Sequence, residues 1–364
     1  MRCDNKLRED KAEKTLLQVL RTVAPGTPLR EGLENILKAK NGGLIIIGDT
    51  PEVMEITEGG FVINAEFAPS SLYELAKMDG AIILSKDTKK ILAANTQMVP
   101  GQNIPSSETG IRHRTAERVA RQTGNLAIAI SQRRGVITIY KGTLKYVLKD
   151  LGVILTKANQ AIQTLEKYRS VLDKVLVVLS ILEFEEAATL YDVTKVIQRV
   201  EMVLRVVKEI ERYISELGVE GRLITMQLEE LLANVEEEGL LVIQDYATTL
   251  GEKSPATILE VIGSWPAEDF LDLSLIARAL GFPGSASILD QHVHPRGYRI
   301  LEKIPRLPLP VIDNLVNTFG SLYKILLASI AELDEVEGIG EVRARSIKYG
   351  LNRYREQLLQ ERHG

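Results

Sequence analysis

The chain has 364 residues, a net charge of −4 and 45% hydrophobic residues, which is typical of a globular protein with two or three domains. A single cysteine, Cys3, excludes an internal disulfide, and only four histidines accompany it, so we expect no structural zinc site of the usual kind. The charged N-terminus, and the lack of an apolar run long enough to span a bilayer, predict a cytoplasmic protein that uses no membrane.

Residues 1–148 are predicted to form an α/β domain, a mixed sheet flanked by helices. Short apolar, β-branched runs alternate with segments of helical periodicity, as expected for helices packed on one sheet. "SQRRG" (131–135) is a short polar turn between two such runs and predicts a hairpin. The predicted strands are 43–48, 60–64, 80–84, 90–95, 126–130 and 136–140, and the predicted helices are 29–39, 71–78 and 115–123.

The rest of the chain is predicted to be helical. No proline occurs between Pro105 and Pro255, and apolar residues recur there at steps of three and four, which predicts an all-α spine over 149–254. Proline and glycine return in 255–364, where short helices predict a small all-α domain. The predicted organisation is therefore three domains, 1–148, 149–254 and 255–364.

The segment "VEGIGEVRARSIK" (336–348) predicts a DNA-binding turn between two helices. Its glycines, Gly338 and Gly340, allow a tight turn and close approach of a ligand, and the following helix offers free N–H groups to a phosphate. Arg343, Arg345 and Lys348 then form a local cationic surface on an acidic chain. The pattern resembles the helix–hairpin–helix motif, which holds the DNA backbone without reading its sequence. A hairpin with a solvated basic face is the alternative.

Asp79 and Gly80 stand between a helical segment and a predicted strand. Asp-Gly is a common turn dipeptide, so a plain loop is one interpretation. The other is a carboxylate held at the rim of a sheet, beside a glycine that lets a ligand come close.

The stretch "SSETGIRHRTAERVARQTG" (106–124) places Arg112, His113 and Arg114 where a helix is predicted to begin. A helix N-terminus favours acidic side chains, so this charge is misplaced unless an anion binds there. The arginines offer planar pairs of donors to phosphate oxygens, and the histidine adds a donor or titratable group. A solvated run of charge is the alternative.

Together, a carboxylate and an anion site suggest phosphoryl or nucleotidyl transfer, which depends on charge neutralisation and positioning. No GxxxxGK sequence is present, so the P-loop route is excluded. A divalent cation, Mg²⁺ or Mn²⁺, bridging Asp79 and the phosphates would fit this chemistry.

"DGA" (79–81) followed by "RHRTAE" (112–117) resembles the diadenylate cyclase family, and the tripartite order resembles its members with a C-terminal helix–hairpin–helix domain. The resemblance implies condensation of two ATP molecules into cyclic di-AMP with release of two pyrophosphates. It implies that Asp79 activates the ribose 3′-hydroxyl and binds the metal, and that Gly80 lies against the nucleotide. The other implied ATP contacts are Met98 at the adenine, Ile111, Arg112, His113, Arg114 and Thr115 around the triphosphate, and Ser131 and Arg134 at phosphates.

The resemblance also implies an assembly and a regulator. Cyclase domains would face each other in a homo-octamer, and branched DNA, such as a recombination intermediate, would modulate synthesis in a nucleoid-associated checkpoint protein that responds to DNA damage. A DNA-binding scaffold with a nucleotide-sensing but non-catalytic N-terminal domain is the alternative function.

Overall fold

The structure is a computed structural model that describes residues 14–250, 253–283 and 286–361, so Cys3 lies outside the described residues. The chain divides into two compact units. The first comprises residues 1–160 and 211–226, and the second comprises residues 161–210 and 227–364. Each unit is described by itself. The three predicted domain ranges remain predictions, because three of the helices contribute residues to both units.

The first unit contains a mixed sheet of eight strands among its described residues, in the order β2-β5-β4-β1-β6-β7-β8, with β3 paired to β5. Strand β1 runs parallel to β4 and antiparallel to β6, and β5 runs antiparallel to β4. The strands are β1 (Gly43–Ile47), β2 (Thr57–Glu58), β3 (Phe61–Glu66), β4 (Ala81–Leu84), β5 (Lys90–Met98), β6 (Leu126–Ser131), β7 (Val136–Lys141) and β8 (Leu144–Val147).

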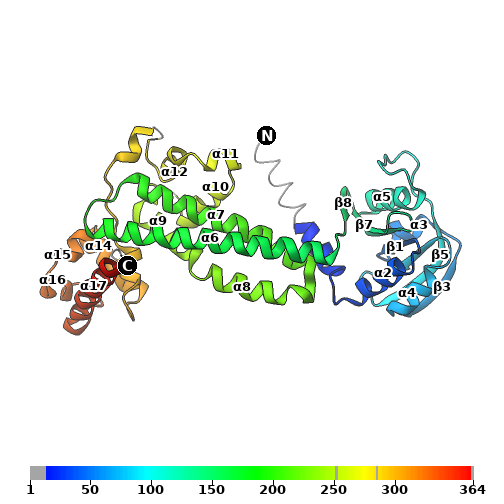
Figure 1. Cartoon of the computed structure of the whole chain (residues 1–364), viewed down its shortest axis with the longest axis horizontal. Helices are drawn as coiled ribbons and strands as arrows, with labels where there is room; N and C mark the ends of the chain where they lie inside the picture. Colours follow the sequence, from blue (N-terminus) through cyan, green and yellow to red (C-terminus); the bar gives the residue numbers. More distant parts are fainter. Residues whose placement is uncertain (1–13, 251–252, 284–285, 362–364) are drawn as a thin grey trace. The chain divides into compact units, whose positions relative to one another are not determined.

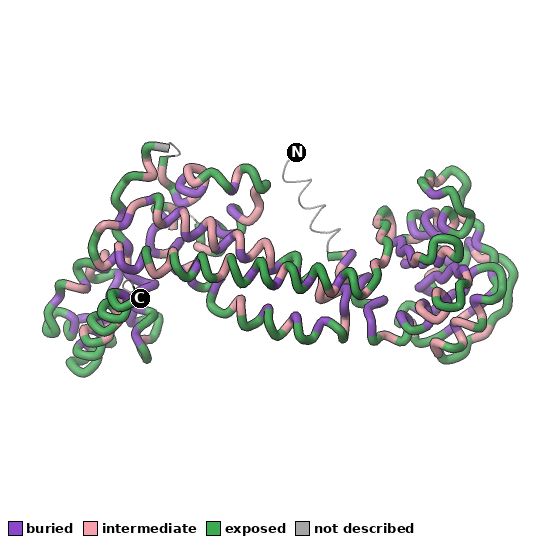
Figure 2. Tube along the Cα trace, in the orientation of Figure 1, coloured by how far each residue is buried: buried purple, intermediate pink, exposed green. Residues whose placement is uncertain are grey.

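Helices cover both faces of this sheet, which confirms the predicted fold class (Figure 1). Helices α2 (Pro28–Lys38) and α4 (Pro69–Leu75) pack on one face, and α3 (Pro51–Glu55) and α5 (Ile111–Thr123) pack on the other. Side chains alternate between faces along a strand. In β1, accordingly, Ile45 and Ile47 contact the first face's cluster and Leu44 and Ile46 the second. The central strands are buried throughout (Figure 2).

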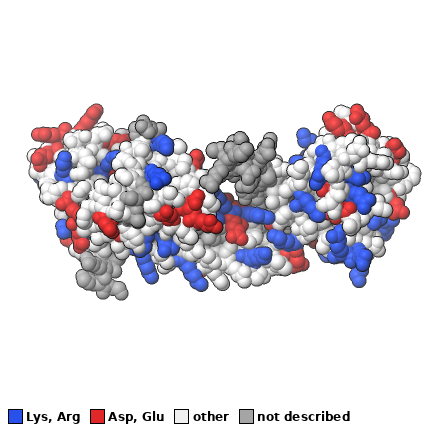
Figure 3. Space-filling view, turned by 90° about the horizontal axis from the view of Figure 1, so that it is seen from above, with Lys and Arg blue, Asp and Glu red and all other residues white. Residues whose placement is uncertain are grey.

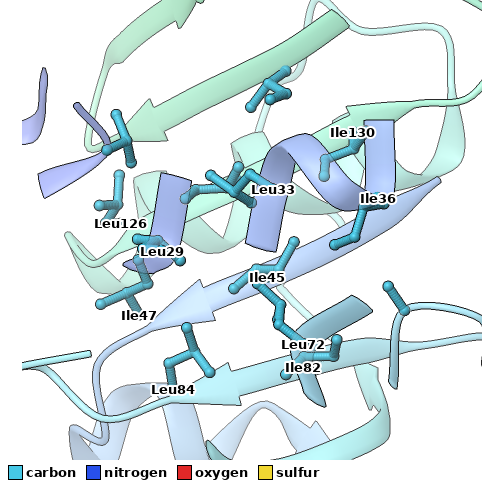
Figure 4. Close-up of a cluster of buried hydrophobic side chains, with 14 of the residues drawn as sticks. Leu29, Leu33, Ile36, Ile45, Ile47, Leu72, Ile82, Leu84, Leu126 and Ile130 are labelled. Carbon is cyan, nitrogen blue, oxygen red and sulfur yellow. The ribbon is translucent and has the colours of Figure 1, made fainter. Parts of the chain in front are cut away.

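The cores of the two faces differ in side-chain size. The α2–α4 face is filled by leucine and isoleucine, and Figure 4 shows Leu29, Leu33 and Ile36 of α2 directed toward side chains of β1, β4 and β6. The α5 face contains many alanines, from Ala81 and Ala127 in the sheet to Ala116 and Ala120 in the helix. Small side chains let a helix approach a sheet closely, so α5 is held firmly against the strands.

The second unit is helical among its described residues. Its long helices are α6 (Leu151–Phe184) and α7 (Leu190–Leu217), which bury apolar side chains at steps of three, four and seven, as the sequence predicts. The short helix η1 (Gly218–Gly221) lies in the first unit, and α8 (Arg222–Leu232) contributes to both. The shorter elements of the second unit are α9 (Val235–Tyr246), α10 (Pro255–Gly263), α11 (Ala267–Phe270), α12 (Leu273–Ala279), η2 (Ala286–Asp290) and α13 (Tyr298–Glu302).

The C-terminal helices share one core. They are α14 (Leu309–Phe319), α15 (Leu322–Leu327), α16 (Ile330–Asp334) and α17 (Glu341–Glu361). Ile339 of the glycine turn, together with Ala344 and Ile347 of α17, is buried in this cluster. Arg299 of α13 is buried beside it and pairs with the fully buried Glu183 of α6. An unpaired charge there would be costly, so this pair ties α13 to the end of α6.

Candidate active site

A cavity of about 870 Å³ opens in the first unit at one edge of the sheet. The cavity lies at the ends of the strands. Because β1 and β4 run opposite to β5 and β6, the amino ends of β1 and β4 meet the carboxyl ends of β5 and β6 there. The N-terminus of α5 completes the wall. The lining residues are Leu44, Asp79, Gly80, Ala81, Asn95, Thr96, Gln97, Met98, Gly110, Ile111, Arg112, His113, Thr115, Ile130, Ser131, Gln132 and Arg133.

Asp79 and Gly80 form one rim of the cavity. Gly80 has φ +92°, and a Cβ built there would lie 2.8 Å from the carbonyl oxygen of Thr96 and 2.9 Å from the carbonyl carbon of Asn95. Only glycine accommodates both the angle and the contact. The Asp79 side chain is 99% exposed, so its carboxylate is free to meet a ligand at the rim.

Arg112 faces this carboxylate across the cavity entrance. Its Nη2 lies 3.4 Å from Oδ1 of Asp79, and its side chain is half-exposed. Gly42 provides room for the guanidinium, since a Cβ at that position would lie 2.6 Å from Nη1 of Arg112. Helix α5 begins beside it with Gly110 as N-cap, no side-chain cap and no acidic residue in the first turn. The guanidinium and the uncapped N–H groups therefore lie together, as an anion site requires.

Arg114 and Arg134 lie outside the cavity lining. Arg114 donates from Nε to the carbonyl of Glu108 and from Nη2 to the carbonyl of Thr109, each at 3.3 Å. Arg134 approaches Glu108 with an N–O distance of 3.8 Å. Both arginines therefore contact the loop before α5, and their predicted phosphate contacts remain predictions. The other predicted ATP contacts, Met98, Ile111, Thr115 and Ser131, all line the cavity.

His113 is buried at the start of α5 and also lines the cavity. Its Nδ1 lies 3.0 Å from the hydroxyl oxygen of Tyr140, and Tyr140 donates to Oε1 of Glu108 at 2.8 Å. Nζ of Lys145 lies 2.5 Å from the same carboxylate oxygen. Among the described residues, Nε2 of His113 is buried without a hydrogen-bond partner.

Burial and this hydrogen-bonded chain set the ionisation of its members. Burial lowers the pKa of His113 and outweighs the opposing charge of Glu108, so the imidazole is neutral near pH 7. Burial also raises the pKa of Glu108, but hydrogen bonds from Lys145 and Tyr140 outweigh it and hold the net pKa below the usual value. Burial, with the Glu108 hydrogen bond, raises the pKa of Tyr140 far above its usual value, so its hydroxyl keeps its proton.

The loop before α5 is fixed by the helix itself. Buried Glu117 accepts from Oγ of Ser106 at 2.6 Å and from the N–H of Ser107 at 3.0 Å, and it pairs with Arg121 at 2.7 Å. Arg118 donates to the carbonyl of Ile104 at 2.9 Å. The loop that leads to Arg112 is therefore held in place by side chains that lie one to three turns later in α5.

Sequence patterns alone missed several lining residues. They are Leu44, Ala81, Asn95, Thr96, Gln97, Gly110, Ile130, Gln132 and Arg133. Most come from strands that carry no motif, and only the pairing of β5 with β4 and of β6 with β1 brings them to this edge. The positive φ of Asn95 (53°) in mid-strand marks a local irregularity that no residue pattern reveals.

A metal could be held here only with help from the substrate. No group of three or more His, Cys, Asp or Glu side chains with metal-binding geometry occurs among the described residues. Asp79 alone offers an exposed carboxylate at the rim. One carboxylate plus substrate phosphates is a set that Mg²⁺ accepts, so the residues fit a nucleotide-borne divalent cation.

The C-terminal turn places the predicted DNA-binding residues as follows. Gly338 has φ +83°, and Arg343 donates to its carbonyl oxygen. Arg345 pairs with Glu341 one turn back on α17. Nζ of Lys348 lies 2.6 Å from the carbonyl of Leu326, and burial lowers its pKa. The two arginines are exposed and able to reach a ligand, whereas Lys348 is half-buried and donates to this carbonyl.

On the face in Figure 3, basic and acidic side chains are intermixed. The described residues include no helix that is long and apolar enough to cross a membrane.

Comparison with known proteins identifies the family. A family model described as the nucleotide-binding region of the DisA bacterial checkpoint controller matches residues 30–144, and the model of its linker region matches residues 148–289. The DNA integrity scanning protein DisA of Carboxydothermus hydrogenoformans is 69% identical over 95% of this chain and 98% of its own length. The chain belongs to the DisA family.

Other DisA proteins agree over nearly the same span. The protein from Clostridium acetobutylicum is 57% identical over 96% of this chain, and that from Symbiobacterium thermophilum is 58% identical over 95%; each match covers 97% of the relative. The cavity lies within the nucleotide-binding region of the DisA family. The chain is therefore a diadenylate cyclase, as its motifs indicate.

Proposed function

We propose that the cavity binds ATP and that two ATP molecules are condensed into cyclic di-AMP, with a divalent cation at Asp79 and with synthesis modulated by DNA. In each of two steps, a ribose 3′-oxygen attacks the α-phosphorus of the other nucleotide, and pyrophosphate leaves. The proton of the attacking hydroxyl passes to a base, and Asp79 is the exposed carboxylate available for this role.

The observation that carries the proposal is the meeting of Asp79, Arg112 and the N-terminus of α5 at one cavity. A polyphosphate needs cationic donors, and Arg112 with the uncapped helix start supplies them. The nucleophile needs a base or metal ligand, and Asp79 supplies it 3.4 Å from the same guanidinium. Gly80 lets the Asp79 loop pack directly on the backbone of Asn95 and Thr96, and this packed segment forms part of the cavity wall against which a base or ribose would lie.

The product has twofold symmetry, and two identical half-sites, each holding one ATP, make it most simply. We therefore propose face-to-face cyclase domains within a homo-oligomer, an octamer as the resemblance implies. Ile111 at the cavity, 82% exposed, is an apolar side chain that such a facing copy would cover.

The DNA-dependent part of the proposal rests on the C-terminal turn and on the relatives, whose name describes scanning of DNA integrity. Exposed Arg343 and Arg345 follow a glycine turn at the start of a 21-residue helix, a geometry suited to sugar–phosphate contacts. Branched DNA is the proposed effector because backbone contacts report DNA shape rather than base sequence.

The test is chromatography of the products after incubation of the purified chain with ATP and Mg²⁺ or Mn²⁺. Cyclic di-AMP is expected from the wild type, and Asp79→Asn should abolish its formation while DNA affinity stays intact. Asp49→Asn, an exposed carboxylate beyond the opposite end of β1, is the matched control and should retain activity. ATP binding with no cyclic di-AMP under either metal would instead support a nucleotide-sensing scaffold.

A further inference from the structure

A chain of hydrogen bonds runs beside the cavity, and its two buried inner members, Glu108 and Tyr140, do not line the cavity, nor does the exposed Lys145 at its outer end. It leads from Lys145 through Glu108 and Tyr140 to His113. Each link is 3.0 Å or shorter. A buried polar group that lacks a hydrogen-bond partner is costly. We can therefore assign which atom donates and which accepts in each hydrogen bond of the chain.

The direction is set from the charged end. Lys145 offers only protons, and its contact keeps Glu108 ionised, so this carboxylate accepts and does not donate. Tyr140 must then direct its single proton to Glu108. Its oxygen therefore faces His113 as an acceptor, at 3.0 Å from Nδ1. Two lone pairs would face each other unless Nδ1 of His113 carries the proton.

A proton on Nδ1 determines the state of the other ring nitrogen, Nε2. In a neutral imidazole with its proton on Nδ1, Nε2 holds a lone pair. Nε2 of His113 is buried and has no hydrogen-bond partner among the described residues, while the side chain itself lines the cavity. An orphaned buried acceptor is destabilising, and a bound ligand that offers a proton or a cation would satisfy it.

We propose that Glu108 and Tyr140 are positioning residues that hold His113 in the Nδ1–H tautomer, so that the ring meets the bound nucleotide complex as an acceptor through Nε2. This deepens the proposed function and rests on it for the identity of the ligand. An acceptor cannot hydrogen-bond to an unprotonated phosphate oxygen, so at the start of α5 phosphate binding is left to the arginines, of which Arg112 lines the cavity. Nε2 of His113 instead contacts a part of the complex that offers a proton or a cation.

The tautomer is measured directly by magic-angle-spinning ¹⁵N NMR of the full chain labelled at histidine, with His113→Asn used to assign the resonances. The wild type at neutral pH is expected to show a protonated Nδ1 and an unprotonated Nε2. Tyr140→Phe removes the acceptor and should shift His113 toward the Nε2–H tautomer. A protonated Nε2 in the wild type would overturn the proposal.

Kinetics supply a second readout. Tyr140→Phe should lower kcat about 10–100-fold, the range found for partners that orient a functional histidine, with ATP affinity nearly unchanged. Tyr146→Phe is the matched control, because Tyr146 also donates to a buried carboxylate, that of Glu216 at 2.5 Å, whereas Tyr140 contacts the cavity residue His113. A loss of ATP affinity with kcat preserved would contradict the assignment.

Glu108→Gln covers the case in which Tyr140→Phe does not fold. A glutamine carbonyl still accepts from Tyr140, so the Nδ1–H tautomer should persist, and its loss would overturn the proposed direction of the chain. The NMR signature needs no turnover. A wild type that shows the expected tautomer but makes no cyclic di-AMP would refute the proposed function and leave the tautomer assignment standing.

Discussion

Arg112, His113 and Arg114 are adjacent in the sequence, but the structure gives them three different surroundings. Arg112 faces Asp79 at the cavity, His113 is buried against Tyr140, and Arg114 donates to carbonyls of the preceding loop. A helix turns about 100° per residue, so consecutive side chains leave it in different directions. The charge that is misplaced at a helix start is therefore divided between ligand binding and support of the loop.

Gly80→Ala should disable the site through the backbone. The new Cβ would meet backbone atoms of Asn95 and Thr96 at under 3 Å and would sit on a positive φ. We expect a cost of about 1–3 kcal/mol in the free energy of unfolding and a large loss of ATP affinity. Chemical denaturation and calorimetric titration measure the two.

Gly135→Ala is the control for this change. Gly135 also has a positive φ, but nothing lies within 4 Å of the position that a Cβ would take, so only the backbone strain remains. Its ATP affinity should match the wild type. Equal affinity losses in the two variants would show that close packing at Gly80 does not shape the cavity.

His113 makes the stability of the first unit depend on pH. Burial lowers its folded pKa below the unfolded value of 6.5, so below that pH the unfolded chain binds more protons than the folded one. Stability is therefore lost as the pH falls through this window. Glu108 acts in the same direction only at more acidic pH, because its unfolded pKa is 4.5.

The measurement is the free energy of unfolding between about pH 7.5 and about pH 5.5 for the wild type and for His113→Asn. The wild type should lose more stability over this range, since the variant lacks the buried imidazole of His113. Parallel pH profiles would mean that burial does not shift the pKa of His113.

At the scale of elements, the sequence predicted most of what lies in the sheet's centre and little of what lies at its edges. The strands around 43–48, 80–84 and 126–130 were predicted because they are buried on both faces and read as continuous apolar runs. The short strands β2 and β8 were missed, since two to four half-exposed residues carry no periodicity. Helix α3, five residues long, was missed for the same reason.

The sequence predicted the position of the candidate site only in part. Asp79 and Arg112 stand out as charges beside predicted element ends, and the resemblance joined them. Gln132 and Arg133 gave no signal of their own, because their place at the cavity depends on the β6–β7 turn lying at the sheet edge reached by β4. Long-range strand pairing, rather than local propensity, decides such positions.

Glu117 is the residue of α5 on which the preceding loop depends. Glu117→Ala would remove the acceptor of the half-buried Ser106 hydroxyl and of the Ser107 N–H and leave Arg121 without this partner, and we expect a cost of about 1–3 kcal/mol. Chemical denaturation measures it, and limited proteolysis should find new cleavage near residues 104–109. Lys38→Ala, which removes an exposed partner of Glu34, should change little. An unaltered loop in Glu117→Ala would contradict this account.

At the scale of the whole molecule, nucleotide chemistry is proposed for the first unit and DNA binding for the C-terminal turn. The double variant Arg343→Ala/Arg345→Ala should weaken DNA binding for every sequence tested and reduce the slope of log affinity against log salt by up to about two. Fluorescence anisotropy at several salt concentrations measures this. Cyclic di-AMP synthesis without DNA should be unchanged.

Lys167→Ala/Lys174→Ala removes the same charge from exposed positions on α6 and is the control. The slope of log DNA affinity against log salt concentration should equal that of the wild type. A uniform loss in both double variants would mean that net charge governs binding, and a changed base preference would contradict contacts confined to the DNA backbone.

The central claim is that this chain joins two ATP molecules through its cavity, and ³¹P NMR of one reaction mixture with Mg²⁺ or Mn²⁺ tests it most directly. The account predicts that ATP signals are replaced by those of pyrophosphate and a cyclic phosphodiester, with two pyrophosphates formed for each cyclic dinucleotide. Pyrophosphate without the cyclic phosphodiester, or ATP that stays intact with either metal, would contradict it.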